Sequence, residues 1–316
     1  MVDSKQQWKA WLYLAPAIVL LLIFTVYPIF NTVRIAFLEG YNSTAALIGT
    51  KFNIGFGNFI EVITSTDPKT NFLQALNNTM LLTVLTVPLS TLLALLIAVA
   101  LNSIKPLQKF LQTIFFLPYV TNSIAIGMVF AAMFNIIGLS PDGSTADSWG
   151  IINFVITFFG GEPINWMNAQ STYVANIAVM TVYIVWNALP FKILILLGGL
   201  QSINKQYYEA ARVDGTPRWR VLTRITVPLL SPMLAYVIIT GFIGGFKEYS
   251  SIVGIFGEKM GPVGNAHSLN TMVGCIYEFL PKTDYGEASA AALILFAIIF
   301  VVTMINLWVG KKRVHF

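Results

Sequence analysis

Six long apolar runs are the feature that most restricts what this chain of 316 residues can fold into. A helix that crosses a bilayer needs about 20 consecutive, mostly apolar residues. The runs that meet this requirement are 11–37, 79–101, 110–137, 171–200, 227–256 and 288–309. Only 10% of the residues are charged, whereas a soluble domain has about a quarter of its residues charged. The sequence therefore predicts an all-α, polytopic membrane protein with six transmembrane helices.

The first run stands where a secretory signal peptide would stand. It is longer than the apolar part of a signal peptide, and no small-residue cleavage site follows it, so we expect a retained helix. The expected organisation is a cytoplasmic N-terminus at 1–10, the first helix at 11–37, an extracytoplasmic loop at 38–78, a five-helix core at 79–309 that contains a cytoplasmic loop at 201–226, and a cytoplasmic tail at 310–316.

Lysines and arginines in the short loops predict the orientation, because they are enriched on the cytoplasmic side of a membrane. With the N-terminus inside, the cytoplasmic segments hold Lys5, Lys9, Lys105, Lys109, Lys205, Arg212, Arg218, Arg220, Arg224, Lys311, Lys312 and Arg313. The opposite side holds Arg34, Lys51, Lys69, Lys259 and Lys282. This split predicts a multi-pass membrane protein with both termini in the cytoplasm.

Several functional classes are not supported by the sequence. The pI is near 9.2, but the basic residues form no stripe with interleaved aromatics, so no nucleic-acid partner is expected. Cys275 is the only cysteine, which leaves no disulfide framework or metal cluster. The histidines, His267 and His315, accompany no nucleophile and base, and no G-x-x-x-x-G-K-[ST] phosphate-binding loop occurs. We expect a non-catalytic chain without a cofactor of its own.

A charged stretch, "YYEAARVDGTPRWRVLTRITVPLL", separates the fourth and fifth apolar runs. Asn204 is a suitable N-cap for a helix over 205–213, and Gly215 can end that helix in the left-handed conformation. Thr216 is expected to cap a second helix with Pro217 at its first position. The stretch therefore predicts two short helices across the cytoplasmic face. The alternative is a solvated loop that only satisfies the charge rule.

The spacing within this stretch resembles the EAA signature of permease subunits of bacterial ABC importers. The matching positions are Glu209, Ala210, Ala211, Gly215, Ile225 and Pro228, while Val227 replaces the usual leucine. In that family the loop forms coupling helices that dock into a groove of a separate ATPase subunit. The resemblance implies that paired alanines allow close helix approach and that Glu209 meets a cation on the partner.

The resemblance extends along most of the chain. "YLAPAIVLLLIFTVYPIF" is similar to the first span of sugar-type permeases, and "FFLPYVTNSIAIGMVFAAMFN" to their third. The chain is thus identified as a member of the carbohydrate branch, near the maltose, multiple-sugar and glycerol-phosphate permeases. This membership implies a type I ABC importer permease fold. It also implies a second homologous permease, two cytoplasmic ATPase subunits that bind ATP and Mg²⁺, and an extracytoplasmic solute-binding protein.

Polar and aromatic side chains inside the spans are the candidates for a substrate path. In the third and fourth spans these candidates are Tyr119, Asn122, Ser123, Trp186, Asn187 and Phe191. The resemblance implies that Tyr119 and Ser123 contact the sugar and that the residues from Trp186 to Phe191 line the same cavity. Aromatic rings stack on the C–H faces of sugars, and amides and hydroxyls bond to sugar hydroxyls. The structural alternative is that these polar groups hold helices together.

Lys247 and Glu248 interrupt the fifth apolar run and are followed by Tyr249. Ionisable groups inside a span are costly and mark pathways or paired partners. We expect these three residues to belong to the substrate path, where Glu248 would accept hydrogen bonds from sugar hydroxyls. The alternative for Lys247 and Glu248 is an ion pair with the sister subunit.

The expected function is therefore a permease subunit of an ATP-driven importer of mono- or oligosaccharides. Glycerol phosphate or another small solute is an alternative substrate within the same importer class. A different class, an ion-coupled secondary transporter acting alone, would need its own coupling-ion residues and often inverted repeats. Only Lys247 and Glu248 could serve it, and the charged stretch would have no role.

Overall fold

The computed structural model describes residues 7–104, 108–137 and 148–313. Lys5, Lys105 and His315 lie outside the described residues, as do most of the expected N-terminal segment and the end of the expected tail. The chain forms two compact units. One comprises Met1–Phe72 with Cys275–Phe296, and the other comprises Leu73–Gly274 with Ala297–Phe316.

The helices of the first unit begin with α1 (Gln7–Leu21) and α2 (Tyr27–Ala36), which a π-helical turn at Leu22–Val26 joins into one long helix. The remaining elements of this unit are α3 (Ser43–Leu47), α4 (Gly57–Thr64), most of α15 (Met272–Phe279) and the first part of α16 (Tyr285–Arg313). Asn58 is buried in α4, and its amide donates hydrogen bonds to the carbonyls of Ala36 and Leu38.

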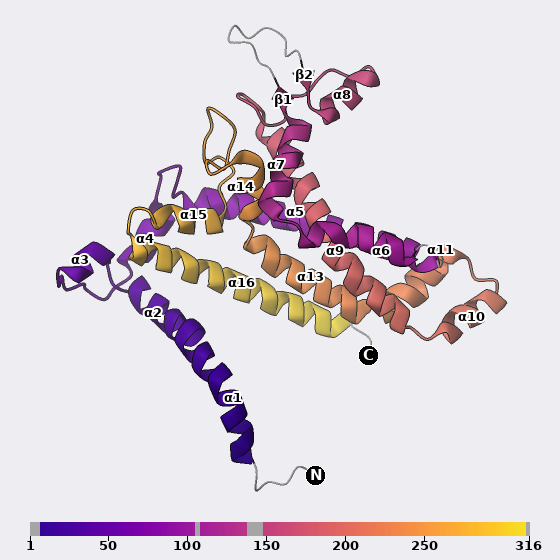
Figure 1. Ribbon diagram of the computed structural model, residues 1–316, viewed down its shortest axis with the longest axis horizontal. Coiled ribbons are helices and arrows are strands. Elements are labelled where there is room, and N and C mark those ends of the chain that lie inside the picture. Colours follow the sequence, from indigo (N-terminus) through magenta and orange to yellow (C-terminus); the bar gives the residue numbers. More distant parts are fainter. Residues whose placement is uncertain (1–6, 105–107, 138–147, 314–316) are drawn as a thin grey trace. The chain divides into compact units, whose positions relative to one another are not determined.

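The second unit holds the start of α15, the second part of α16 and all the remaining elements (Figure 1). In chain order they are α5 (Phe72–Ser103), α6 (Gln108–Phe116), a 3-10 helix (Leu117–Val120), α7 (Ser123–Phe134), β1 (Ile136–Ile137), β2 (Ser148–Trp149), α8 (Ile151–Phe158), α9 (Tyr173–Ser202), α10 (Lys205–Val213), α11 (Arg218–Val221), a π-helical turn (Leu222–Thr226), α12 (Val227–Leu229), α13 (Ser231–Phe246) and α14 (Ser250–Phe256). The strands pair antiparallel, with Ile136 opposite Trp149. Over the ranges that the structure describes, the predicted all-α architecture is confirmed apart from these two strands of two residues each.

Within the described residues, four continuous helices are long and apolar enough to cross a membrane: Trp8–Ala36, Phe72–Ser103, Tyr173–Ser202 and Tyr285–Gly310. Two further spans are each built from a bent pair of helices. Phe110–Val120 and Ser123–Phe134 meet at 99°, and Arg218–Leu229 and Ser231–Phe246 meet at 70°. Counting each pair as one span gives six.

The bend in the third expected span has a local cause. Pro118 lies in the tight 3-10 turn, and the backbone is extended at Asn122. The Asn122 side chain then accepts hydrogen bonds from the N–H groups of Ile124 and Ala125, which is an N-cap that starts α7 as a new helix. The sequence predicted a continuous span here, and this cap explains the difference.

Each of the two π-helical turns in the described residues ends two positions before a proline. Tyr27, the residue before Pro28, donates its N–H to the carbonyl of Leu22. In the same way Val227, the residue before Pro228, donates its N–H to the carbonyl of Leu222. A proline ring clashes with the carbonyl four residues earlier in a regular α-helix. The wider turn relieves that clash, so the helix continues past the proline.

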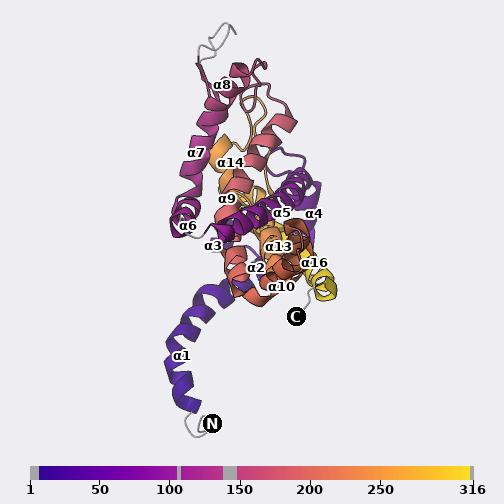
Figure 2. The ribbon, with the colours of Figure 1, turned by 90° about the vertical axis from the view of Figure 1, so that its right-hand side faces the viewer.

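Two apolar clusters form the core of the second unit, and α9 contributes to both. One contains Met180 and Tyr183 of α9 with Ile252 of α14. The other contains Leu196 of α9 with Ala94 of α5. Beside the first cluster, α14 packs along α7, as both views show (Figure 1, Figure 2). The cavity described next lies between these two clusters along α9.

Candidate functional site

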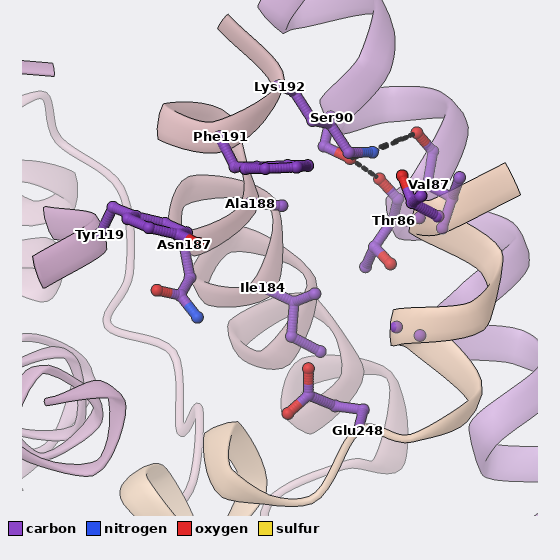
Figure 3. Close-up of a pocket in the computed structure, with 14 residues that line it drawn as sticks. Thr86, Val87, Ser90, Tyr119, Ile184, Asn187, Ala188, Phe191, Lys192 and Glu248 are labelled. Carbon is purple, nitrogen blue, oxygen red and sulfur yellow. Dashed lines mark hydrogen bonds between the residues drawn. The ribbon is translucent and has the colours of Figure 1, made fainter. Parts of the chain in front are cut away.

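A cavity of about 340 Å³ opens in the second unit. It lies between α5, the turn before α7, α9 and the end of α13 (Figure 3). Its lining residues are Thr86, Val87, Ser90, Tyr119, Ile184, Asn187, Ala188, Phe191, Lys192, Thr240, Gly241, Gly244, Gly245 and Glu248. Ligand pockets usually measure about 300–1,000 Å³, so the size suits a small polar molecule.

One wall of the cavity is aromatic. The rings of Tyr119 and Phe191 are stacked, with centroids 6.0 Å apart and planes 19° apart. In Figure 3 the two rings lie along one side, with the Asn187 amide directed into the space beside them. This combination of ring faces and an amide can hold a sugar by stacking on C–H groups and bonding to hydroxyls.

The opposite wall is formed by glycines of α13. A Cβ added to Gly241 would lie 3.3 Å from Lys192 Nζ, and one added to Gly245 would lie 2.7 Å from Thr83 Cγ2. These two glycines therefore let α13 approach its neighbours closely. A Cβ added to Gly244 would meet no atom within 4 Å, so this glycine leaves space in the cavity.

Lys192 is a charged side chain in the middle of α9 and is only 4% exposed. Its ammonium group donates hydrogen bonds to Ser90 Oγ at 2.7 Å, to Thr91 Oγ1 at 3.0 Å and to the Val87 carbonyl at 3.2 Å, all on α5 (Figure 3). Three protons thus have three neutral acceptors. The sequence prediction missed Lys192, although a single lysine in an otherwise uncharged span was a usable signal.

Glu248 lies at the break between α13 and α14, and it lines the cavity. Its Oε1 accepts hydrogen bonds from the N–H of Tyr249 at 3.1 Å and the N–H of Ser251 at 3.0 Å. The carboxylate thereby caps the start of α14. Lys247 ends α13, is exposed and lies off the cavity.

Four of the nine expected path residues line the cavity: Tyr119, Asn187, Phe191 and Glu248. The other five, which include Lys247, lie elsewhere. Asn122 caps α7, and Ser123 Oγ lies 3.1 Å from the Tyr183 hydroxyl. Trp186 packs against Phe130, with ring centroids 5.1 Å apart, and Tyr249 packs against the same core cluster. Among the cavity residues that the sequence prediction missed, Thr86 and Ser90 belong to α5, where ordinary hydroxyls give no signal.

The charged stretch forms the expected first helix, α10, over Lys205–Val213. The Asn204 side chain caps it by accepting a hydrogen bond of 3.0 Å from the N–H of Gln206. At its end Gly215 has φ +65°. The N–H of Thr216 bonds to the carbonyl of Ala211, and the N–H of Gly215 bonds to the carbonyl of Arg212. This is a Schellman motif, so both predicted ends of the helix are confirmed.

The predicted start of the second short helix is wrong by one residue. Thr216 makes no cap, and Pro217, with ψ 146°, is the extended residue before α11 begins at Arg218. The helix starts one residue later because the backbone is still extended at Pro217, so this proline stands before the helix and not at its first position.

The residues of the EAA-like spacing occupy different environments. Glu209 and Ala210 are exposed on α10, whereas Ala211 is only 5% exposed and packs inward. Ile225 lies half-buried in the π-helical turn, and Pro228 lies half-buried in α12. The Tyr208 hydroxyl lies 3.3 Å from Thr226 Oγ1, which links α10 to that turn.

The loop also exposes large apolar side chains. Tyr207, Val213 and Trp219 are each more than half exposed, and the first two lie on the same helix as Glu209. Large exposed apolar residues gathered with charged ones are typical of a protein interaction surface. The arrangement therefore suits docking of another protein on α10.

The family model described as "Binding-protein-dependent transport system inner membrane component" matches residues 70–315. The chain is 28% identical to the lactose transport system permease protein of Rhizobium radiobacter, over 96% of this chain and 95% of that one. It is 30% identical to the multiple sugar-binding transport system permease protein of Streptococcus mutans, over 96% and 95% of the two chains.

Two solved structures share the fold. A chain of a bacterial ABC transporter involved in the import of the acidic polysaccharide alginate matches with a TM-score of 0.75 and 23% identity, covering 98% of both chains. A chain of the bacterial alginate ABC transporter in complex with an alginate pentasaccharide-bound periplasmic protein matches with a TM-score of 0.72 and 23% identity, over 96% of this chain and 93% of that one. At this identity the likeness concerns the fold alone.

Proposed function

Because the chain belongs to the family of binding-protein-dependent transport system inner membrane components, we propose that it forms the sugar path of an ATP-driven importer. It is a multi-pass membrane protein and a permease subunit of an ABC importer, and permeases of this kind are not catalytic. The match over residues 70–315, which contain both the cavity and the charged loop, is the observation that carries the proposal.

The substrate is a mono- or oligosaccharide. Relatives named for lactose, for trehalose and maltose, and for multiple sugars support this assignment. The cavity supports it independently, since Tyr119 and Phe191 offer ring faces while Asn187, Thr86 and Glu248 offer polar groups. Sites that recognise hydroxyls depend on such groups, because a buried polar group left unpaired costs about 1–3 kcal/mol.

The loop around α10 is the coupling site for a separate ATPase. Its exposed Glu209 and Ala210, with the apolar Tyr207 and Val213 beside them, provide a docking face. ATP and Mg²⁺ are bound by the partner, which closes on ATP and moves α10. That movement would switch the cavity between two access states, as expected for a two-state element that is biased at one site and read at another.

The complete importer contains a second homologous permease, two ATPase subunits and an extracytoplasmic binding protein. One of the two structures with the same fold is a complex with an alginate pentasaccharide-bound periplasmic protein, which supports the last of these partners. Both termini and the α10 loop face the cytoplasm, in line with the distribution of lysines and arginines in the loops.

Co-purification tests the proposal. The tagged chain, expressed with the other importer subunits, should retain the ATPase through detergent extraction, and uptake of sugar should require ATP. Glu209→Ala should release the ATPase while Glu162→Ala, an exposed acid in another loop, should not. Uptake by this chain alone, driven by an ion gradient, would instead indicate a secondary transporter.

A further inference from the structure

The cavity has opposite charges at its two ends. Lys192 and Glu248 both line it, and Figure 3 places Glu248 next to Ile184, with Lys192 beyond Phe191 on the far side. Ile184 and Lys192 are two turns apart on α9, which is about 12 Å at 1.5 Å per residue. A solute in the cavity therefore meets a cation at one end and a carboxylate at the other.

The charge of Lys192 is fixed in place. Its three protons are all donated to α5, to Ser90, Thr91 and the carbonyl of Val87. On its other side the ammonium group meets Gly241, where an added Cβ would lie 3.3 Å from Nζ. The group thus cannot swing away without breaking three hydrogen bonds.

Nothing in the described part of the chain neutralises that charge. The acceptors of Lys192 are hydroxyls and a carbonyl, and no acidic side chain there forms an ion pair with it. A buried charge without a counter-charge acts strongly on nearby solutes, because the surrounding dielectric constant is low. Glu248 is more exposed than Lys192, so water screens its carboxylate more.

We propose that Lys192 is a specificity-determining residue that makes the path discriminate by charge, favouring sugars with a carboxylate over sugars with an ammonium group. The affinity for neutral sugars should lie between the affinities for these two classes. The inference rests on the proposed sugar-import function and adds the chemical class of substrate. Lys192 acts through its field on the solute, while Tyr119, Phe191 and Asn187 supply the contacts.

The competing explanation is that Lys192 is only a brace between α5 and α9. The two roles separate by substitution. Lys192→Met keeps the length of the side chain and removes the charge, whereas Lys192→Arg keeps the charge. Ser90→Ala keeps the charge of Lys192 and removes its shortest hydrogen bond. A brace would be weakened by both Lys192→Met and Ser90→Ala, and every sugar would be affected alike.

The experiment is calorimetric binding of three disaccharides of matched size to the purified importer without its binding protein, so that the selectivity of that protein plays no part. One sugar is neutral, one ends in a uronic acid and one ends in an amino sugar. The wild type should bind the acid more tightly than the amine. Lys192→Met should lower the acid-to-amine affinity ratio about tenfold, as expected for losing a unit charge several ångströms away in a poorly hydrated site. Lys192→Arg and Ser90→Ala should keep the ratio within about twofold.

An unchanged ratio in Lys192→Met, or an equal change in Ser90→Ala, would overturn the proposal. If Lys192→Met does not assemble, Lys192→Gln tests the same charge, because it removes the charge and keeps a hydrogen-bond donor on the side of Ser90. Its acid-to-amine ratio should also lie about tenfold below that of the wild type, and an unchanged ratio would overturn the proposal. A wild type that binds none of the three sugars would contradict the sugar assignment itself.

Discussion

Gly127 on α7 lies directly against Gly254 on α14, and a Cβ added to Gly127 would come within 2.7 Å of Gly254 Cα. The neighbouring atoms belong to the backbone, so they cannot rotate away as a side chain would. This contact holds α14 on α7. Because Glu248 caps the start of α14, the contact also sets one end of the cavity.

Substituting Gly127 should therefore destabilise the second unit. Gly127→Ala forces α7 and α14 apart, and overpacking of this kind costs about 1–3 kcal/mol. The thermal unfolding temperature of the purified protein in detergent should fall. Gly198→Ala on α9 is the matched control, because its added Cβ meets no atom within 4 Å. Equal unfolding temperatures for the two variants would show that the glycine contact does not matter.

Gly215 allows a second test, on the coupling loop. Its φ of +65° suits glycine, is tolerated by asparagine and is strained for a β-branched residue. Gly215→Val should disrupt the end of α10, reduce ATPase binding and abolish sugar uptake, while the chain still reaches the membrane. Gly215→Asn should retain most uptake. Because no atom lies near the added Cβ, the difference would report backbone conformation alone. Normal uptake by Gly215→Val would show that α10 has no role in coupling.

Variants of Asn187 and Ser123 test whether polar residues in the spans contact the sugar or hold helices together. Asn187 lines the cavity, so Asn187→Ala should impair uptake of some sugars more than others and leave ATPase binding intact. Ser123 does not line the cavity; its Oγ lies 3.1 Å from the Tyr183 hydroxyl and accepts a longer hydrogen bond of 3.5 Å from Asn187, so Ser123→Ala should change the preference among sugars less than Asn187→Ala does. Uptake of several sugars, measured beside ATPase pull-down for each variant, checks both expectations. Uniform loss in Asn187→Ala with loss of assembly would contradict its assignment to the path.

Cys275 lies buried in α15, and its reactivity follows from its pKa. Burial, with a smaller contribution from the charge of Glu278, raises the pKa of the thiol to about 12. Thiolate is the reactive form, so the native protein should resist maleimide at about pH 8, below even the ordinary pKa of a free thiol. It should react only as the pH approaches the raised pKa or after denaturation. Rapid labelling of the native wild type under the milder condition would contradict the buried position of Cys275.

This low background permits a test of orientation. Asp214→Cys, exposed beside Gly215, should be labelled by an impermeant reagent only from the cytoplasmic side. Glu162→Cys, exposed in the loop after α8, should be labelled only from outside. Gly143, in the same expected outer loop, lies outside the described residues. Labelling of both variants from outside intact cells would overturn the six-span orientation.

Local signals in the sequence were sufficient for α10. Its bounds, its Asn204 cap and its left-handed Gly215 are as predicted, since each depends on residues within one or two turns. The start of α11 was missed because proline is common at the first position of a helix, whereas here the backbone of Pro217 is extended and the helix begins at Arg218.

The cavity was harder to predict, because its residues meet only in three dimensions. Lys192 bonds to Ser90 and Thr91, which are 102 and 101 positions earlier in the chain, and no sequence pattern links them. Asn122 had the right chemistry for a sugar contact, but the break in the third span uses it as a helix cap. Residue type alone could not distinguish these two roles.

The central claim is that this chain is the path of an ATP-driven sugar importer, and reconstitution tests it most directly. The chain, its sister permease, the ATPase and the binding protein would be placed in liposomes, and uptake of a radiolabelled sugar would be measured with ATP and with a non-hydrolysable analogue. We predict accumulation against a gradient only with ATP and only with the binding protein present, and its loss in Gly215→Val but not in Gly198→Ala. Sugar accumulation that continues without ATP, or that is unchanged in Gly215→Val, would contradict the account.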